Sequence, residues 1–246
     1  MKKIVLGLVV GAGVLFGGKL SVEYVNSVNN TIAKYNDAQV HVSNGRFDAA
    51  IPYLYKALEQ RGEAVRLANE ELAKNEAMRE NITLWKAIMT HFPIFNQICA
   101  MGLMASNESV INECFANLDK IEDVNKIPHE DFKRELRQNF NPIAVLTENI
   151  GVYYGNQREI AKLGELAKYS LANYPQDASG WYLTGKYLAN QEQTKDNACF
   201  SVLATKKAYG LGATQQEVKE VATAEHNLKD CKSLEEYANL FLQGGI

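Results

Sequence analysis

The chain has 246 residues, of which 46% are hydrophobic and 22% are charged, and its formal net charge is −3. This length and composition exclude an intrinsically disordered protein and allow one large domain or two small ones. No stripe of lysine and arginine alternates with aromatic residues, which excludes a nucleic-acid-binding protein. The chain has only 5 prolines and many helix-favouring residues, and it therefore predicts an all-α fold.

An apolar run near the N-terminus predicts a membrane anchor. Lys2 and Lys3 precede residues 4–18, which carry no charge before Lys19. As a helix this run reaches only about 22 Å, against roughly 30 Å for the hydrocarbon core of a bilayer. Continuation of the helix gives an uncleaved signal-anchor over residues 1–25, through which the protein contacts the membrane. Lysines remain in the cytoplasm, so we expect a single-pass protein of a bacterial inner membrane with most of its chain in the periplasm.

Two alternatives to an uncleaved anchor stay open: a cleaved signal peptide and a buried helix of a cytosolic protein. Cleavage requires small residues one and three positions before the cut. A cut after Gly18 or Gly17 would place Phe16 or Leu15 at the third position, where both side chains are too large. The sequence therefore favours retention of the anchor over cleavage.

Glycines in the apolar run form two pairs with a spacing of four residues, Gly7 with Gly11 and Gly13 with Gly17. This spacing allows two membrane helices to approach closely, and it predicts a homo-oligomer that forms through the anchors. Glycine is also common in membrane helices in general, so both interpretations stay open.

Residues 26–140 predict an irregular α-helical region. A turn is expected over residues 44–47, because asparagine and glycine favour turns, and a helix over residues 48–60 follows it. Residues 63–79 are strongly charged and contain few large apolar side chains. We expect this charged stretch to lie on the surface or to bridge two helical lobes.

Four cysteines, Cys99, Cys114, Cys199 and Cys231, allow three pairings. Cys99 and Cys114 lie at matching distances from a predicted turn at residues 106–107, so an antiparallel helical hairpin would place them side by side. Cys199 and Cys231 form the second predicted disulfide, across a loop between two helices. Disulfides agree with export to an oxidising compartment, and four free buried cysteines are the alternative.

The spacing of polar residues matches no catalytic, cofactor or metal motif, so we expect a protein without enzyme activity, cofactor or bound metal. No H-E-x-x-H or C-x2-C pattern occurs, no phosphate-binding glycine loop ends in lysine and serine or threonine, and no G-x-S-x-G sequence is present. The four histidines lie in separate segments of the chain: His41, His91, His129 and His226.

A spacing of 34 residues relates two parts of the region 141–246. Its members are small or aromatic residues: Gly151 and Tyr154, then Trp181, Gly185 and Leu188. The run 181–188 resembles the W-x2-L-G-x2-Y signature of tetratricopeptide repeats, with threonine in place of the leucine and leucine in place of the tyrosine. The resemblance implies a solenoid of helical hairpins with a C-terminal capping helix, and it extends to one partial unit near residues 34–60.

Two capping-box patterns predict the starts of the last two helices. In this pattern a serine or threonine caps the helix and a glutamate three residues later bonds back to it. The two patterns are Thr214-x-x-Glu217 and Ser233-x-x-Glu236.

The resemblance implies a binding protein, because such repeats form a groove for a partner. Tyr153, Tyr182 and Tyr187 are candidate groove residues, since tyrosine combines a large contact area with a polar tip; core packing is the alternative for each. We therefore expect a non-catalytic, membrane-anchored periplasmic adaptor or assembly factor that binds protein partners in the cell envelope. A structural subunit of a secretion or pilus machine and an accessory domain of a glycan ligase or polymerase are the alternatives.

Overall fold

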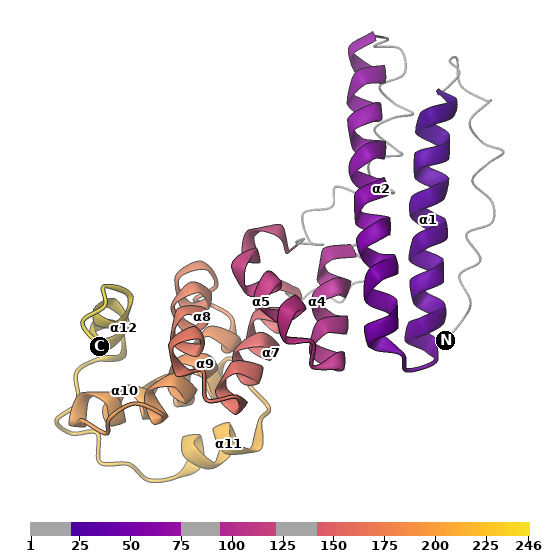
Figure 1. The fold of residues 1–246 in the computed structure, drawn as a ribbon. Helices are drawn as coiled ribbons and strands as arrows, with labels where there is room; N and C mark the ends of the chain where they lie inside the picture. The colour runs from indigo at the N-terminus through magenta and orange to yellow at the C-terminus, as the bar shows by residue number, and fades with distance from the viewer. Residues whose placement is uncertain (1–20, 75–93, 122–141) are drawn as a thin grey trace. The chain divides into compact units, whose positions relative to one another are not determined.

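A computed structural model of the chain describes residues 21–74, 94–121 and 142–246. Every regular element within these ranges is a helix (Figure 1), so the predicted all-α class is confirmed. The described residues form two compact units. The first unit contains residues 21–74, 94–110 and 119–121, and the second contains Ile111–Leu118 and residues 142–246.

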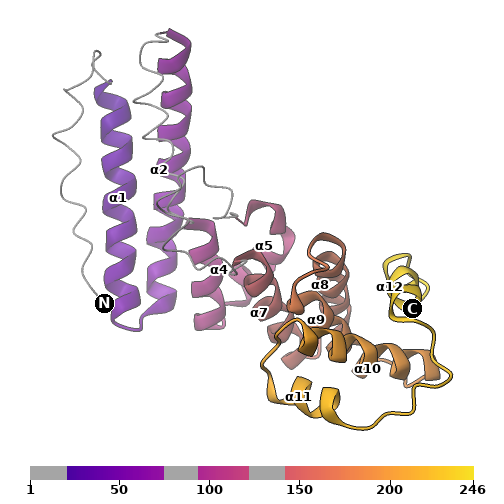
Figure 2. The same cartoon turned by 180° about the vertical axis from the view of Figure 1, so that it is seen from behind.

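A long helical hairpin dominates the first unit. Helices α1 (Val22–Ser43) and α2 (Phe47–Lys74) lie side by side along most of their length (Figures 1 and 2). Gly45 stands in the turn between them with φ at +68°, a left-handed conformation that glycine adopts without a clash at Cβ. The predicted turn at residues 44–47 is therefore confirmed, and α2 is longer than the predicted helix over residues 48–60.

Small residues of α2 form the interface at the far end of the hairpin from this turn. Ala64 and Ala68 are 1% and 0% exposed and pack with Tyr24 and Val28 of α1. Because alanine side chains are short, the ring of Tyr24 fits between the helices, and its burial raises the pKa of the phenol to about 12. The predicted surface location of this stretch is therefore wrong for Ala64 and Ala68, and residues 75–79 lie outside the described residues.

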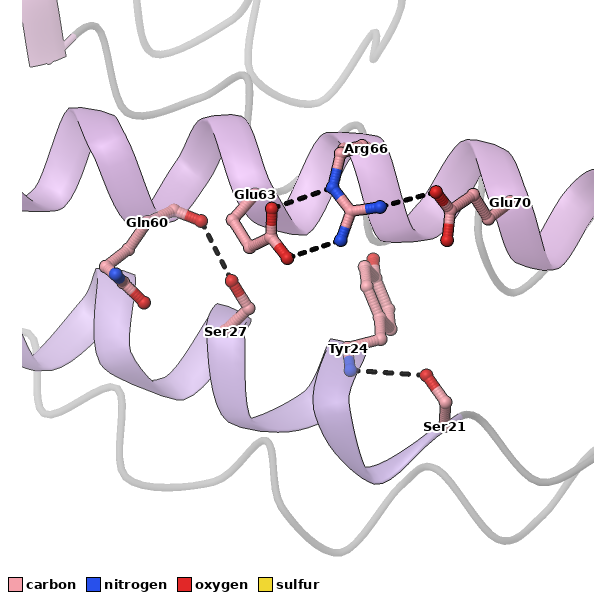
Figure 3. A network of polar contacts seen from close by, with 7 residues as sticks. All are labelled: Ser21, Tyr24, Ser27, Gln60, Glu63, Arg66 and Glu70. Atoms are coloured by element: carbon pink, nitrogen blue, oxygen red, sulfur yellow. Dashed lines mark hydrogen bonds and ion pairs between the residues drawn. The ribbon is translucent and has the colours of Figure 1, made fainter.

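Polar contacts accompany this apolar interface (Figure 3). The hydroxyl of Ser27 donates to the backbone carbonyl of Gln60 at 3.0 Å and joins the two helices. Arg66 lies between Glu63 and Glu70 on the solvent side of α2 and donates to both carboxylates. The hydrogen bond from Arg66 lowers the pKa of Glu63, but these side chains are exposed, so the ion pairs add little to stability.

Helices α4 (Ile94–Ala105) and α5 (Glu108–Ala116) follow, and a 3-10 turn, η3 (Leu118–Lys120), comes after them. Cys99 and Cys114 are each disulfide-bonded, so the alternative of free buried cysteines is wrong for both residues.

Six helices make up most of the second unit. From α7 to α11 each helix packs against the next one. Helix α9 also lies against α7, and α12 contacts α8 and α10. The bounds are α7 (Pro142–Asn156), α8 (Ile160–Asn173), α9 (Ala178–Ala189), α10 (Lys195–Gly210), α11 (Gln216–Thr223) and α12 (Leu234–Leu242).

The two glycines related by the 34-residue spacing are both buried at close helix contacts. A Cβ atom on Gly151 of α7 would lie 2.5 Å from the side chain of Leu183 in α9. A Cβ atom on Gly185 of α9 would lie 2.5 Å from Thr205 Oγ1 in α10. One glycine therefore allows contact between successive hairpins, and the other allows contact within a hairpin.

Residues 111–118 belong with the second unit, although the sequence placed them in the region 26–140. The hydroxyl of Tyr154, a fully buried residue, donates to Asn112 Oδ1 at 2.7 Å. Its ring meets the ring of Phe115 edge to face at 5.5 Å between centroids. These tertiary contacts bring a short segment into the second unit that no local pattern assigned to it.

The C-terminal helix α12 is attached by a disulfide and by aromatic packing. Cys199 of α10 is bonded to Cys231, with 5.7 Å between their Cα atoms, as predicted. The ring of Phe200, which is fully buried, stacks on Tyr237 at 5.4 Å between centroids. Ser233 caps α12 with the predicted capping box, so that local prediction is confirmed.

Two carboxylates stabilise the start of α12. Lys232 donates to Asp196 at 2.7 Å and the hydroxyl of Tyr237 donates to the same carboxylate at 2.9 Å. The hydrogen bond from Lys232, followed by that from Tyr237, lowers the pKa of Asp196. The backbone N–H of Ser233, followed by its hydroxyl, lowers the pKa of Glu236.

Acid is expected to loosen α12 before the rest of the second unit. A carboxylate with a lowered pKa contributes stability above its ordinary pKa of about 4 and loses that contribution as the pH falls through the lowered value. Hydrogen exchange of Leu234–Leu242, corrected for the intrinsic rate at each pH, should therefore accelerate from about pH 4 downward relative to α8. In Asp196→Asn this acceleration should be smaller, and an equal pH response of α8 and α12 would contradict the prediction.

No helix in the described ranges is long and apolar enough to cross a membrane. Helices α1 and α2 have 22 and 28 residues but carry charged side chains along their length. Helix α4 is uncharged but has 12 residues, which corresponds to about 18 Å of helix. This finding contradicts the predicted location as a single-pass protein of a bacterial inner membrane with most of its chain in the periplasm.

The predicted anchor over residues 4–18 lies outside the described residues, together with its four glycines and the proposed oligomer contact. Its predicted continuation to residue 25 is wrong. The hydroxyl of Ser21 accepts a hydrogen bond from the backbone N–H of Tyr24 at 3.2 Å, so Ser21 is the N-cap and α1 starts at Val22. Tyr24 is then buried within the hairpin.

Candidate functional site

The three candidate groove tyrosines differ in their surroundings. Tyr182 is only 5% exposed, so its ring is part of the core. The ring of Tyr187 is half-buried and occupies the space above Gly164, where an added Cβ would lie 2.6 Å from it. Tyr153 is half-buried, with its ring 5.6 Å from that of Tyr154. Packing within the fold therefore accounts for much of their area, and Tyr182 is the least exposed of the three.

Trp181, part of the repeat signature, supports the fold. Its side chain is 7% exposed and its Nε1 donates to the backbone carbonyl of Pro175 at 2.8 Å. This bond joins the first turn of α9 to the loop that precedes it.

Polar side chains of α7 and α9 meet on one side of the second unit. Ser179, Tyr182 and Lys186 follow one side of α9 at helical spacing. Glu148 approaches from α7, and its carboxylate accepts from the Ser179 hydroxyl at 2.7 Å. We call these four residues the α7/α9 face.

A short helix of the same chain contacts the α7/α9 face through polar side chains at its start. Helix α11 lies beside α10 in both views (Figures 1 and 2). The hydroxyl of Tyr182 donates to Glu217 Oε1 at 2.8 Å. The side-chain amide of Gln215 donates to Glu148 Oε1 at 2.6 Å. Two side chains at the start of α11 therefore bind two groups of the face.

The α9 side of this face attracts a carboxylate, and the α7 side attracts a hydrogen-bond donor. Lys186 Nζ lies 4.0 Å from the Glu217 carboxylate and 5.7 Å from the centroid of the Tyr182 ring. Burial, followed by the bond to Glu217, raises the pKa of Tyr182, so the phenol stays protonated and donates. The backbone N–H of Glu217, followed by the Tyr182 hydroxyl, lowers the pKa of that carboxyl. Glu148 accepts both of its hydrogen bonds.

The sequence misassigned the start of α11. The capping box predicted at Thr214 is wrong, because Gln215 is the N-cap residue and makes no side-chain capping bond. The amide of Gln215 bonds to Glu148 instead, and the Glu217 carboxylate bonds to Tyr182. The four-residue spacing of Tyr182 and Lys186 is the one local signal of the face, and the contribution of Glu148 depends on tertiary packing alone.

Replacement of Tyr182 with phenylalanine is expected to weaken the attachment of α11 while leaving the ring packing intact. The variant loses one hydrogen bond to a largely exposed carboxylate, so we expect the free energy of unfolding to fall by about 0.5–1 kcal/mol. The measurement is a double-mutant cycle with Glu217→Ala, which removes the acceptor, using urea denaturation. Coupling of about 0.5 kcal/mol is expected, and strict additivity would show that the two side chains do not interact.

No group of three or more histidine, cysteine, aspartate or glutamate side chains within the described ranges is arranged to hold a metal ion. His41 stacks on Tyr53 at 5.0 Å between centroids, and His226 Nε2 lies 2.9 Å from the carbonyl oxygen of Val221. The other two histidines lie outside the described residues. The two described histidines therefore take part in separate contacts.

No protein-family model, curated protein or solved structure matches the chain. The tetratricopeptide resemblance therefore rests on the residues of the chain itself.

Proposed function

We propose that the chain is a non-catalytic adaptor that binds a segment of another protein on its α7/α9 face. The observation that supports this proposal is that the face already holds a helical segment through specific polar contacts. These contacts use the phenol of Tyr182, the ammonium group of Lys186 and the carboxylate of Glu148. Positioned polar groups of this kind select a partner by complementary charge.

The arrangement of the hairpins also supports a binding role. Helices α7 and α9 are the first helices of two successive hairpins, and they pack against each other. The tetratricopeptide resemblance implies this kind of stacking, in which equivalent helices line a common surface for a partner. The close helix contacts at Gly151 and Gly185 leave no room for a Cβ atom and so favour this stacking.

Both disulfides support a role in an oxidising compartment. All four cysteines of the chain are disulfide-bonded. Stable disulfides form in secreted, extracellular and periplasmic proteins and are rare where thiols are kept reduced. We therefore place the proposed partner in the same kind of compartment.

Site-specific photocrosslinking in the native cells tests this proposal. A photoreactive amino acid replaces Val145, which lies on α7 near Glu148 and is 39% exposed. The matched control carries it at Val40 of α1, which is 58% exposed and lies in the first unit. We expect one discrete adduct from position 145 that disappears with Lys186→Glu. Equal adducts from both positions, or no adduct from position 145, would contradict a partner site on this face.

A further inference from the structure

Helix α11 is held weakly compared with its neighbours. It has 8 residues, and Val218 is its only buried side chain. A helix of this length is unstable in isolation, and this one lacks the side-chain cap that α12 has. The carboxylate of Glu217 is bound to Tyr182, yet its side chain remains 61% exposed.

The fit of α11 to the face is incomplete. Gln215 Oε1 is buried and has no hydrogen-bond partner in the described part of the chain. A buried acceptor without a donor opposes binding, because in water it would be hydrogen-bonded. A segment that supplied a donor to Glu148 without burying an acceptor would bind this position better than α11 does.

We infer that α11 is a built-in occupant of the partner site and that the partner displaces it, an inference that rests on the proposed function. The partner is a short helical segment of another protein. It presents a carboxylate to Tyr182 and Lys186, an apolar side chain at the position of Val218, and an amide or other donor to Glu148. These are the same groups that α11 presents, except that the partner does not bury an unpaired acceptor such as Gln215 Oε1.

A displaced α11 stays close to the face, because both ends of its segment are attached to α10. The segment 211–231 begins at the end of α10 and ends at Cys231, which is bonded to Cys199 of the same helix. A tethered competitor acts at a high effective concentration. If α11 occupies the face about nine-tenths of the time, the apparent affinity for the partner is about tenfold below its intrinsic value.

The test uses the full-length oxidised chain and a fluorescein-labelled synthetic peptide with the sequence of residues 211–226. Fluorescence anisotropy measures binding of this peptide to the wild type and to Val218→Asp, in which α11 cannot bury its apolar side chain. We expect Val218→Asp to bind the peptide about tenfold more tightly than the wild type, because its own α11 no longer competes. Equal affinity of the two proteins would overturn the inference.

A charge exchange tests whether the peptide occupies the α7/α9 face. Lys186→Glu added to Val218→Asp should reduce binding about tenfold, and a peptide with Glu217→Lys should restore it, because the pair is then re-formed with opposite signs. Peptide binding that is insensitive to Lys186→Glu would place the peptide elsewhere and overturn the inference.

A second variant guards against misfolding. Glu217→Lys changes an exposed side chain and leaves Val218 in place, but it brings an ammonium group toward Lys186 and releases α11. Circular dichroism verifies that each variant is folded, and Glu217→Lys should bind the wild-type peptide as tightly as Val218→Asp. If the folded Glu217→Lys variant binds it no better than the wild type, α11 does not occupy a binding site.

The same measurements separate this inference from the proposed function and from self-association. Crosslinks at Val145 without an increase in peptide affinity would leave the adaptor proposal intact and reject displacement of α11. If the variants bind the peptide more tightly than the wild type but position 145 gives no crosslink, α11 does occupy a binding site, and the proposed partner is absent from the cells sampled. A wild-type dimer in light scattering that Glu217→Lys abolishes would assign the site to a second copy of the chain and overturn the inference.

Discussion

Replacing Gly180 with alanine is expected to lower the free energy of unfolding of the second unit by about 3 kcal/mol. Gly180 lies in the first turn of α9, where this helix crosses α8. An added Cβ would lie 2.9 Å from the backbone nitrogen of Leu171 and 3.0 Å from the carbonyl carbon of Ser170. Because these atoms belong to the backbone of α8, they cannot rotate away as a side chain would, and the two helices must separate.

Gly62 provides a matched control for this substitution. It lies within α2, and an added Cβ would have no neighbouring atom within 4 Å. Gly62→Ala should therefore raise the free energy of unfolding by about 0.5–1 kcal/mol, through helix propensity alone. Urea denaturation of both variants measures the difference. A Gly180→Ala variant as stable as Gly62→Ala would show that α8 and α9 do not approach as closely as described.

Local sequence patterns were sufficient to predict several parts of the fold. The turn at Gly45 and the capping box at Ser233 depend on residues next to each other in the chain, so their geometry is determined locally. In each case few contacts from elsewhere in the chain compete with the local preference.

The hairpin of α1 and α2 shows why the charged stretch after residue 62 was misassigned. Large apolar residues predict a core, but here Ala64 and Ala68 form it with Tyr24 supplied by the other helix. An alanine stripe is equally consistent with an exposed helix, since alanine has the highest helix propensity. The tertiary partner therefore decides which side is buried, and that partner is about 40 residues away in sequence.

The α7/α9 face could not be predicted from the sequence either, because it too depends on contacts between residues far apart in the chain. Gln215 and Glu217 bond to α7 and α9, and these bonds replace the local cap that the pattern at Thr214 predicted. A capping box satisfies backbone N–H groups that are exposed at a helix start. The loss of such a cap in favour of distant contacts therefore marks a site where tertiary binding outweighs local stability.

Removal of the disulfide between Cys199 and Cys231 is the second change with a large expected effect. The bond closes a loop with a sequence separation of 32 residues. Loop-closure entropy predicts that Cys199→Ser with Cys231→Ser lowers the free energy of unfolding by about 3–4 kcal/mol. Thermal and urea denaturation of the double variant measure this loss.

The loss should be concentrated in the segment that the bond closes. Without the disulfide, α11 and α12 are held by the carboxylate of Asp196, the ring of Phe200 and the polar contacts of the α7/α9 face. Hydrogen exchange should therefore rise in α11 and α12 well before it rises in α8. Wild-type protein with this disulfide reduced should behave like the double variant, because both lack the same constraint. A double variant that is markedly less stable than the reduced protein would trace the loss to a buried serine hydroxyl at position 199, since Cys199 is 7% exposed.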